Sequence, residues 1–168
     1  MSEKPVTDYW YGFDTETQDG IAVLLTRKDS YLLFPKSFDA VAEFLLRYRH
    51  NVAFNLEYDV RACLAYLPPE VWQSLYYTKG ATHGPWKLGY LPGKRFVITD
   101  TRTGARASYY DAYPFFQQTL EAAARATLGE GKAEIPRAWY SRMEPLLRRK
   151  GWRREKIIAY GKIGRAHV

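Results

Sequence analysis

The sequence predicts an α/β domain in which a mixed β-sheet is flanked by helices on its faces. The chain has 168 residues, which is the length of a single domain and enough to bury a core. Hydrophobic residues make up 46% of it and aromatic residues 16%, a composition that argues against a disordered chain. Strand and helix patterns follow in the order three strands, helix, strand, helix, two strands and two helices, which is typical of a mixed sheet with covering helices.

In the first half of the chain, short β-prone runs alternate with amphipathic segments. Strands are expected over residues 8–13, 21–26, 31–34 and 52–54. Ser37 is a suitable N-cap for a helix that continues through Arg49, because the apolar residues between them share one face. A second helix is expected from about Tyr58 to Leu67, where two prolines end it.

The second half contains one clear hairpin and two further helices. Residues 69–85 are ambiguous, and we expect a short helix at 71–77 followed by a loop. Residues 96–101 and 106–110 alternate around a turn at 102–104, which predicts the hairpin. One helix is expected to begin at Pro114 and end at Gly129, and the last to begin near Arg153. No repeat or domain boundary is evident, so residues 1–168 are interpreted as one domain.

The net charge of +7 is concentrated in the C-terminal segment, residues 132–168. Lys and Arg outnumber Asp and Glu by 11 to 3 there, whereas residues 1–131 carry 14 against 15. Such a block attracts a polyanion, and it is equally compatible with a solubilising surface. If it binds nucleic acid, the side chains expected to do so are Arg148, Arg149, Arg153 and Arg154.

Cysteine usage and hydropathy limit the class of protein. Cys63 is the single cysteine, so an internal disulfide and a cysteine-built zinc site are excluded. The apolar runs are too short to span a bilayer, and residues 1–5 lack the apolar core of a signal peptide. We therefore expect a cytoplasmic protein in a reducing environment.

Two carboxylates, Asp14 and Glu16, stand two residues apart at the end of the first predicted strand. Alternate residues of a strand point to the same side, so both are expected to face one site. Like charges repel there unless a cation lies between them, which favours hard, oxygen-liganded ions such as Mg²⁺. Taken alone, such a pair is more often a solvated strand end or a helix cap.

Two further segments combine with this pair. Asn55, Tyr58 and Asp59 follow the strand at 52–54, and Asp59 opens a helix, where the helix dipole favours a carboxylate and where a simple cap is the plainer interpretation. The Tyr58 ring could stack on a base, a contact typically worth about 1–3 kcal/mol. Tyr160 is followed four residues later by Gly164 on one face of the last helix, a position more typical of core packing.

In their order and spacing these segments resemble the 3′→5′ proofreading exonuclease of family B DNA polymerases, most closely the protein-primed phage type. Phe13-Asp14-Thr15-Glu16-Thr17 is similar to the first motif of that family, Asp-x-Glu-Thr. The segment 54–59 is similar to the second motif, Asn-x-x-aromatic-Asp, and the segment 155–164 to the third, Tyr-x-x-x-Asp. The resemblance covers nearly the whole chain and implies the RNase H-like fold of the DEDD exonucleases.

The resemblance also implies an activity, the removal of nucleotides from the 3′ end of single-stranded DNA, and a role for each motif residue. Asp14, Glu16 and Asp59 would bind metal and Tyr160 would orient the attacking water, these four being the catalytic residues. Those expected to contact the terminal nucleotides are Thr17, Phe54, Asn55 and Tyr58. The implied cofactors are two divalent ions, Mg²⁺ or Mn²⁺, one to activate water and one to stabilise the leaving oxygen.

No role is implied for the three histidines, and Asp111, outside the three motifs, is expected to cap the helix that follows it. The implied partners are a DNA 3′ end and, beyond it, a polymerase domain or other replication proteins. The setting is bacterial or viral replication, and we expect a monomer without membrane contact.

One position departs from the family pattern, because Gly164 stands where the fourth carboxylate is expected and no acid follows Glu155. Glycine cannot bind metal, and each 1.36 kcal/mol of added barrier slows a reaction tenfold, so activity is expected to be weakened. His167 does not replace the acid, since the subclass that uses histidine places it before a final carboxylate.

Gly164 favours an alternative, a degenerate module that binds single strands without cleaving them. Another RNase H-like nuclease, such as a resolvase or ribonuclease, is a further alternative that Asn55, Asp59 and Tyr160 argue against. DNA and RNA are not distinguished.

Overall fold

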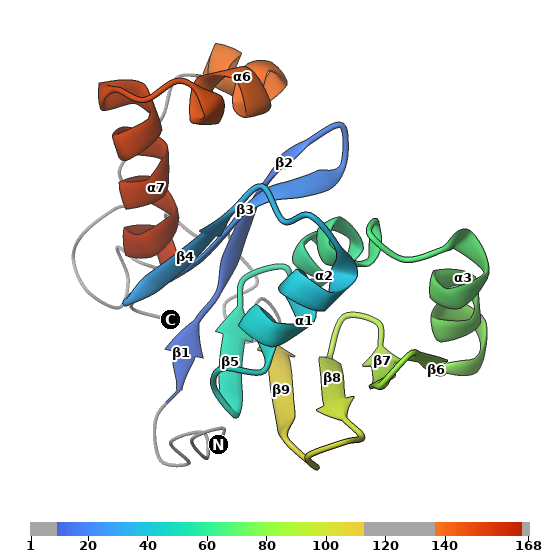
Figure 1. The fold of residues 1–168 in the computed structure, drawn as a ribbon. Coiled ribbons are helices and arrows are strands. Elements are labelled where there is room, and N and C mark those ends of the chain that lie inside the picture. Colours follow the sequence, from blue (N-terminus) through green and yellow to red (C-terminus); the bar gives the residue numbers. More distant parts are fainter. Residues whose placement is uncertain (1–9, 113–136, 166–168) are drawn as a thin grey trace.

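The computed structural model describes residues 10–112 and 137–165, and it is a mixed α/β structure (Figure 1). Its strands are β1 (Tyr11–Gly12), β2 (Asp14–Gln18), β3 (Ile21–Arg27), β4 (Ser30–Leu33), β5 (His50–Ala53), β6 (Gly80–His83), β7 (Trp86–Leu91), β8 (Arg95–Asp100) and β9 (Arg106–Asp111). Its helices are α1 (Phe38–Leu45), α2 (Leu56–Leu64), α3 (Pro69–Thr78), the 3₁₀ helix η1 (Arg137–Arg142), α6 (Met143–Arg148) and α7 (Trp152–Arg165).

The strands form a six-stranded sheet in the order β1-β5-β9-β8-β7-β6 and a three-stranded sheet in the order β2-β3-β4. β1 pairs with β5, and β5 with β9, in parallel, whereas the remaining pairs are antiparallel. Only Phe13 separates β1 from β2, and its backbone N–H donates to the Val52 carbonyl at 2.8 Å. One continuous stretch of chain therefore belongs to both sheets, and the predicted mixed sheet with flanking helices is confirmed.

The first strand extends beyond its predicted end. It was expected to stop before Asp14, but Asp14–Gln18 forms β2 and pairs antiparallel with β3. The turn comes only at Asp19 and Gly20, which have φ values of 54° and 81°. Such left-handed conformations suit glycine and are tolerated by aspartate, so the turn is set by these two residues. As a result, the two carboxylates lie within an edge strand, and their ladder partners are Thr26 and Leu24 of β3.

Helix α1 begins as predicted and ends early. The Ser37 hydroxyl accepts the Ala40 N–H at 3.4 Å, which confirms the N-cap. The helix was expected to reach Arg49 and stops at Leu45 instead. Its last carbonyls already have donors, because Arg27 Nη1 donates to Phe44 O at 2.8 Å and Tyr109 Oη donates to Leu45 O at 2.6 Å. These side chains replace the amides that a further helical turn would supply.

The segment after α2 contains more structure than predicted. The expected short helix is present as α3, with Pro69 at its first position, where proline is favoured. Residues 80–85 were expected to form a loop, but β6 and β7 make a hairpin through Gly84. Burial alternates along β7, with Trp86, Leu88 and Tyr90 inside, which is the period of a half-buried strand. The helix predicted at 114–129 lies outside the described residues.

Helices cover both faces of the three-stranded sheet. Ala22 and Leu25 of β3 belong to the core under α1 and α2, whereas Val23 and Leu24 pack against residues of α6 and α7. Figure 1 shows α7 along β3 and β4, on the side away from α1 and α2. β2 therefore runs between the second-motif helix, α2, and the third-motif helix, α7.

Candidate active site

The site begins with Thr15, the second residue of β2, which holds two acidic side chains at once. Its backbone N–H donates to Asp14 Oδ1 at 2.8 Å and to Asp59 Oδ1 at 3.1 Å. Its hydroxyl donates to the same Asp59 oxygen at 2.7 Å. Asp14 comes from β2 and Asp59 from the first turn of α2, and they are only 2% and 1% exposed. These hydrogen bonds help to hold two buried carboxylates next to each other, although carboxylates repel and lose hydration on burial.

The separation of these two carboxylates is bounded by the shared donor. Asp14 Oδ1 and Asp59 Oδ1 can be no farther apart than the sum of 2.8 and 3.1 Å. One ion with oxygen ligands at 2.0–2.6 Å can link carboxylates that lie within about 8 Å. The pair is therefore close enough to share a divalent cation.

Glu16 lies two residues beyond Asp14 on β2 and is 5% exposed. Its negative charge acts on the Tyr58 hydroxyl, as do the charges of Asp59 and Asp14. Burial is the main cause that raises the pKa of Tyr58, the three carboxylates raise it further, and the hydrogen bond to Thr17 lowers it. With its pKa raised above 10.0, the Tyr58 hydroxyl keeps its proton at neutral pH and can act as a donor at the edge of an acidic site.

The second motif is positioned by an unusual backbone. Asn55 is the N-cap of α2 and has φ 63° and ψ 64°, the left-handed region, without a capping bond from its side chain. Its N–H donates to Asp111 Oδ1 at 3.1 Å, and its own side chain is exposed. Residues held in this region cluster at functional sites, where the surroundings enforce them. The Asn55 amide is thus available to a ligand instead of closing the helix.

The remaining residues of the first two motifs divide between surface and interior. Tyr58 is 47% exposed and shares a 2.7 Å hydrogen bond with Thr17, so its ring can accept a flat ligand. The β-ladder shifts register between Glu16 and Thr17, a bulge of the kind often found beside active sites. Phe54 is 7% exposed, so a contribution from it to nucleotide contacts would be indirect.

The third motif lies on α7, which packs against β2 and β3. Tyr160 and Gly164 both fall within this helix, four residues and about one turn apart. The side chain of Tyr160 is outside the described part of the structure. The segment before α7, which contains η1 and α6, is bound to Gln18 at the end of β2. The Gln18 amide donates to Ser141 O at 3.4 Å and accepts the Glu144 N–H at 2.9 Å.

The donor set suits a hard cation in part. Mg²⁺ commonly binds through one or two carboxylates and keeps several waters, and Asp14 and Asp59 supply two carboxylates. Within residues 10–112 and 137–165, no cluster of three His, Cys, Asp or Glu side chains has the geometry of a metal site. The predicted set of three carboxylate ligands therefore stays a prediction.

Asp111 has a position that the sequence interpretation did not give it. It ends β9, is paired with Ala53 of β5, and accepts the Asn55 N–H. Since parallel neighbours end at the same sheet edge, an acid at the end of the second of two such strands is a signal for this site. Its expected role as a cap for the following helix lies outside the described residues.

The four arginines of the predicted basic block differ in their surroundings. Arg148 forms an ion pair with Glu144 at 2.6 Å and lies over the Phe34 ring. Arg154 is half-buried, whereas Arg149 and Arg153 are exposed. Only the last two combine exposure with the absence of a carboxylate partner among the described residues.

No protein-family model, curated protein or solved structure matches this chain. Among the described residues, no helix has the length and apolar character needed to cross a membrane.

Proposed function

We propose that this chain is a metal-dependent 3′→5′ exonuclease that removes nucleotides from the 3′ end of single-stranded DNA. The observation that carries the proposal is the shared Thr15 donor, which joins Asp14 of the first motif to Asp59 of the second. Two sequence motifs that are 44 residues apart thereby meet at one buried point. Strands β1, β5 and β9 are parallel, and the antiparallel β2-β3-β4 sheet follows directly from β1. This arrangement supports an RNase H-like fold.

In this proposal each residue has a defined task. Asp14, Glu16 and Asp59 hold divalent cations, which supply an activated water and stabilise the leaving oxygen when they are bound. The exposed Tyr58 ring stacks on the terminal base, and Thr17 keeps that ring in place through its hydroxyl. The Asn55 amide contacts the terminal nucleotide, and Tyr160 orients the water from α7.

The second candidate function is a single-strand binding module that does not cleave. Gly164 favours it, because α7 then brings no carboxylate to the site at the position of the family's fourth ligand. Both functions use the same nucleotide contacts, so they differ only in turnover.

An assay with a 5′-labelled single-stranded oligonucleotide and Mg²⁺ tests the proposal. We expect a ladder that shortens one nucleotide at a time from the 3′ end and that EDTA abolishes. Circular single-stranded DNA of the same composition should stay intact, since it has no 3′ end. Cuts within the circle would show that the chain is an endonuclease and reject the exonuclease proposal. Tight binding without any cleavage would establish the second candidate function, the binding module.

A further inference from the structure

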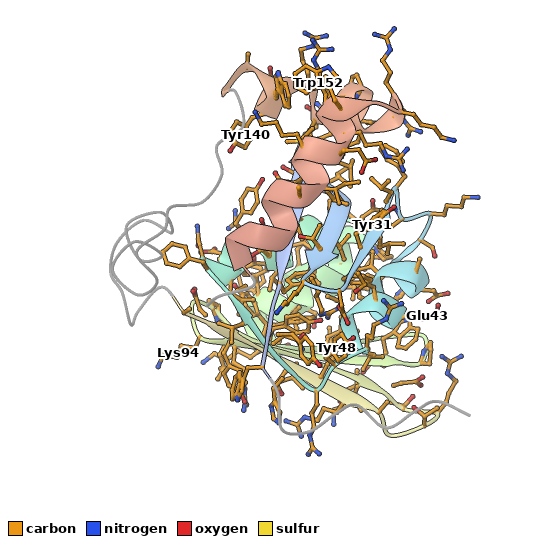
Figure 2. All side chains as sticks on the ribbon, turned by 90° about the vertical axis from the view of Figure 1, so that its left-hand side faces the viewer. Tyr31, Glu43, Tyr48, Lys94, Tyr140 and Trp152 are labelled. Carbon is orange, nitrogen blue, oxygen red and sulfur yellow. The ribbon has the colours of Figure 1, made fainter. Side chains whose placement is uncertain are left out.

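A second candidate site lies between η1, α6 and the first turn of α7, in a pocket of about 610 Å³. Its lining includes two tryptophans and four cationic side chains: Trp139, Trp152, Arg142, Arg149, Lys150 and Arg153. None of the described residues that line this pocket belongs to the three motifs. Figure 2 shows Trp152 at the end of α7 that points away from the sheet.

The charge of this pocket is of one sign. Among the described residues that line it, none is Asp or Glu. Of the neighbouring acids, Glu144 accepts hydrogen bonds from Arg148 at 2.6 and 3.0 Å. Glu155 is exposed on α7. Four positive charges without carboxylate partners among the described residues attract an anion.

The aromatic part of the pocket is open to a flat ligand. The rings of Trp139 and Trp152 lie 5.7 Å apart at 58°, so they form a corner and leave a ring face open. Trp152 is 62% exposed, which is a large apolar surface to leave in water. Arg153 lies 4.8 Å from the Trp152 ring centre, and Lys156 lies 5.9 Å from that of Trp139. Each ring therefore has a cation over one of its faces.

We propose that this tryptophan pocket binds a nucleobase together with the adjoining backbone phosphates of a single strand. Alternating flat rings and cations match the alternating bases and phosphates of a nucleic acid, and neither an acidic peptide nor an anionic membrane offers bases to stack. The position of the pocket on the bound strand rests on the proposed function. Trp152 precedes Tyr160 by eight residues, or about 12 Å along α7 at 1.5 Å per residue. The pocket thus holds nucleotides on the 5′ side of a 3′ end at Asp14 and Asp59.

The first test measures binding of a labelled twelve-nucleotide oligothymidylate by anisotropy, in EDTA, so that turnover plays no part. Trp152→Ala should raise the dissociation constant about tenfold, which is within the range for loss of one stacked base. Trp152→Phe should restore most of it, because a ring remains. Trp10→Ala is the matched control, since Trp10 is also exposed but lies before β1. Equal losses in both alanine variants, or none in either, would overturn the proposal.

The second test separates the charges from the rings. The double variant Arg149→Gln with Arg153→Gln should flatten the slope of log affinity against log salt by about 0.7 per charge removed. Arg106→Gln, a change at an exposed arginine on β9, should leave that slope unchanged. An unchanged slope in the double variant would mean that these arginines only solubilise the surface, contrary to the proposal.

A third comparison decides the ligand class. An abasic strand of equal length should bind no more tightly than the thymidylate does to Trp152→Ala, since it lacks the base contact at Trp152 and the one proposed at Tyr58. Binding of a polyglutamate peptide at the affinity of the oligonucleotide would make the pocket a site for acidic proteins and reject the proposal. These outcomes do not depend on cleavage. If the chain binds DNA through Trp152 but never cleaves it, the pocket proposal stands and the exonuclease proposal fails. If the chain cleaves DNA but does not bind it through Trp152, only the exonuclease proposal stands.

Discussion

Asp14→Ala is expected to lower metal-dependent hydrolysis of a single-stranded 3′ end by at least about 10³-fold, or about 4 kcal/mol of barrier. Asp14 is one of the two carboxylates that the Thr15 N–H joins, and its loss leaves Asp59 without the nearby charge that a shared cation needs. The rate should be measured by the loss of a 3′-terminal label in Mg²⁺ and in Mn²⁺. Both the wild-type chain and a Gly164→Asp background should show the loss.

Two further variants exclude a folding defect. Asp14→Asn keeps an oxygen that can accept the Thr15 N–H, so it should fold normally and still be inactive. Asp100→Asn removes another buried carboxylate, which ends β8 of the six-stranded sheet and pairs with Arg102, and it should keep activity. Activity in Asp14→Asn close to that of the wild type would refute a ligand role for this carboxylate.

Gly164→Asp is expected to raise hydrolysis at least about 10²-fold, or about 2.7 kcal/mol of barrier. Position 164 lies one helical turn after Tyr160 on α7, and this helix packs against β2. A carboxylate there would add a ligand on the side opposite α2. Glycine is a poorer helix former than aspartate, so the substitution should not cost helix propensity.

Gly164→Ala and Gly164→Asn are the matched controls for this gain. Alanine gives the helical stabilisation without an oxygen, and asparagine gives an oxygen without the charge, so neither should reproduce the full increase. Thermal unfolding of all three variants shows whether the helix itself has changed. A wild-type chain that already degrades DNA rapidly, with no gain from aspartate, would show that another group supplies the fourth ligand.

The sequence predicted those features that depend on local patterns. The hairpin of β8 and β9, the Ser37 cap and the alternation of strands with helices all follow from turn residues, capping side chains and hydrophobic periodicity. The proximity of Asp14 and Asp59 followed from a resemblance of ordered motifs, and the structure brings these two residues together.

The features that the sequence did not predict depend on contacts between distant residues. The early end of α1 is caused by Arg27 and Tyr109, which come from β3 and β9. The left-handed Asn55 is linked in the same way to Asp111, 56 residues away. Glycines at 80 and 84 indicated a loop, and the hairpin they border becomes evident only in the pairing of β6 with β7. Local propensity does not contain this information, because tertiary contacts override it.

A titration of Mn²⁺ into the full chain, followed by electron paramagnetic resonance of the free ion, tests most directly whether Asp14 and Asp59 form a metal site. The account predicts at least one bound Mn²⁺ per chain, lost in Asp14→Ala, weakened in Asp59→Asn and unchanged in Asp100→Asn. Binding that persists in both Asp14→Ala and Asp59→Asn, or no binding at millimolar Mn²⁺, would contradict it.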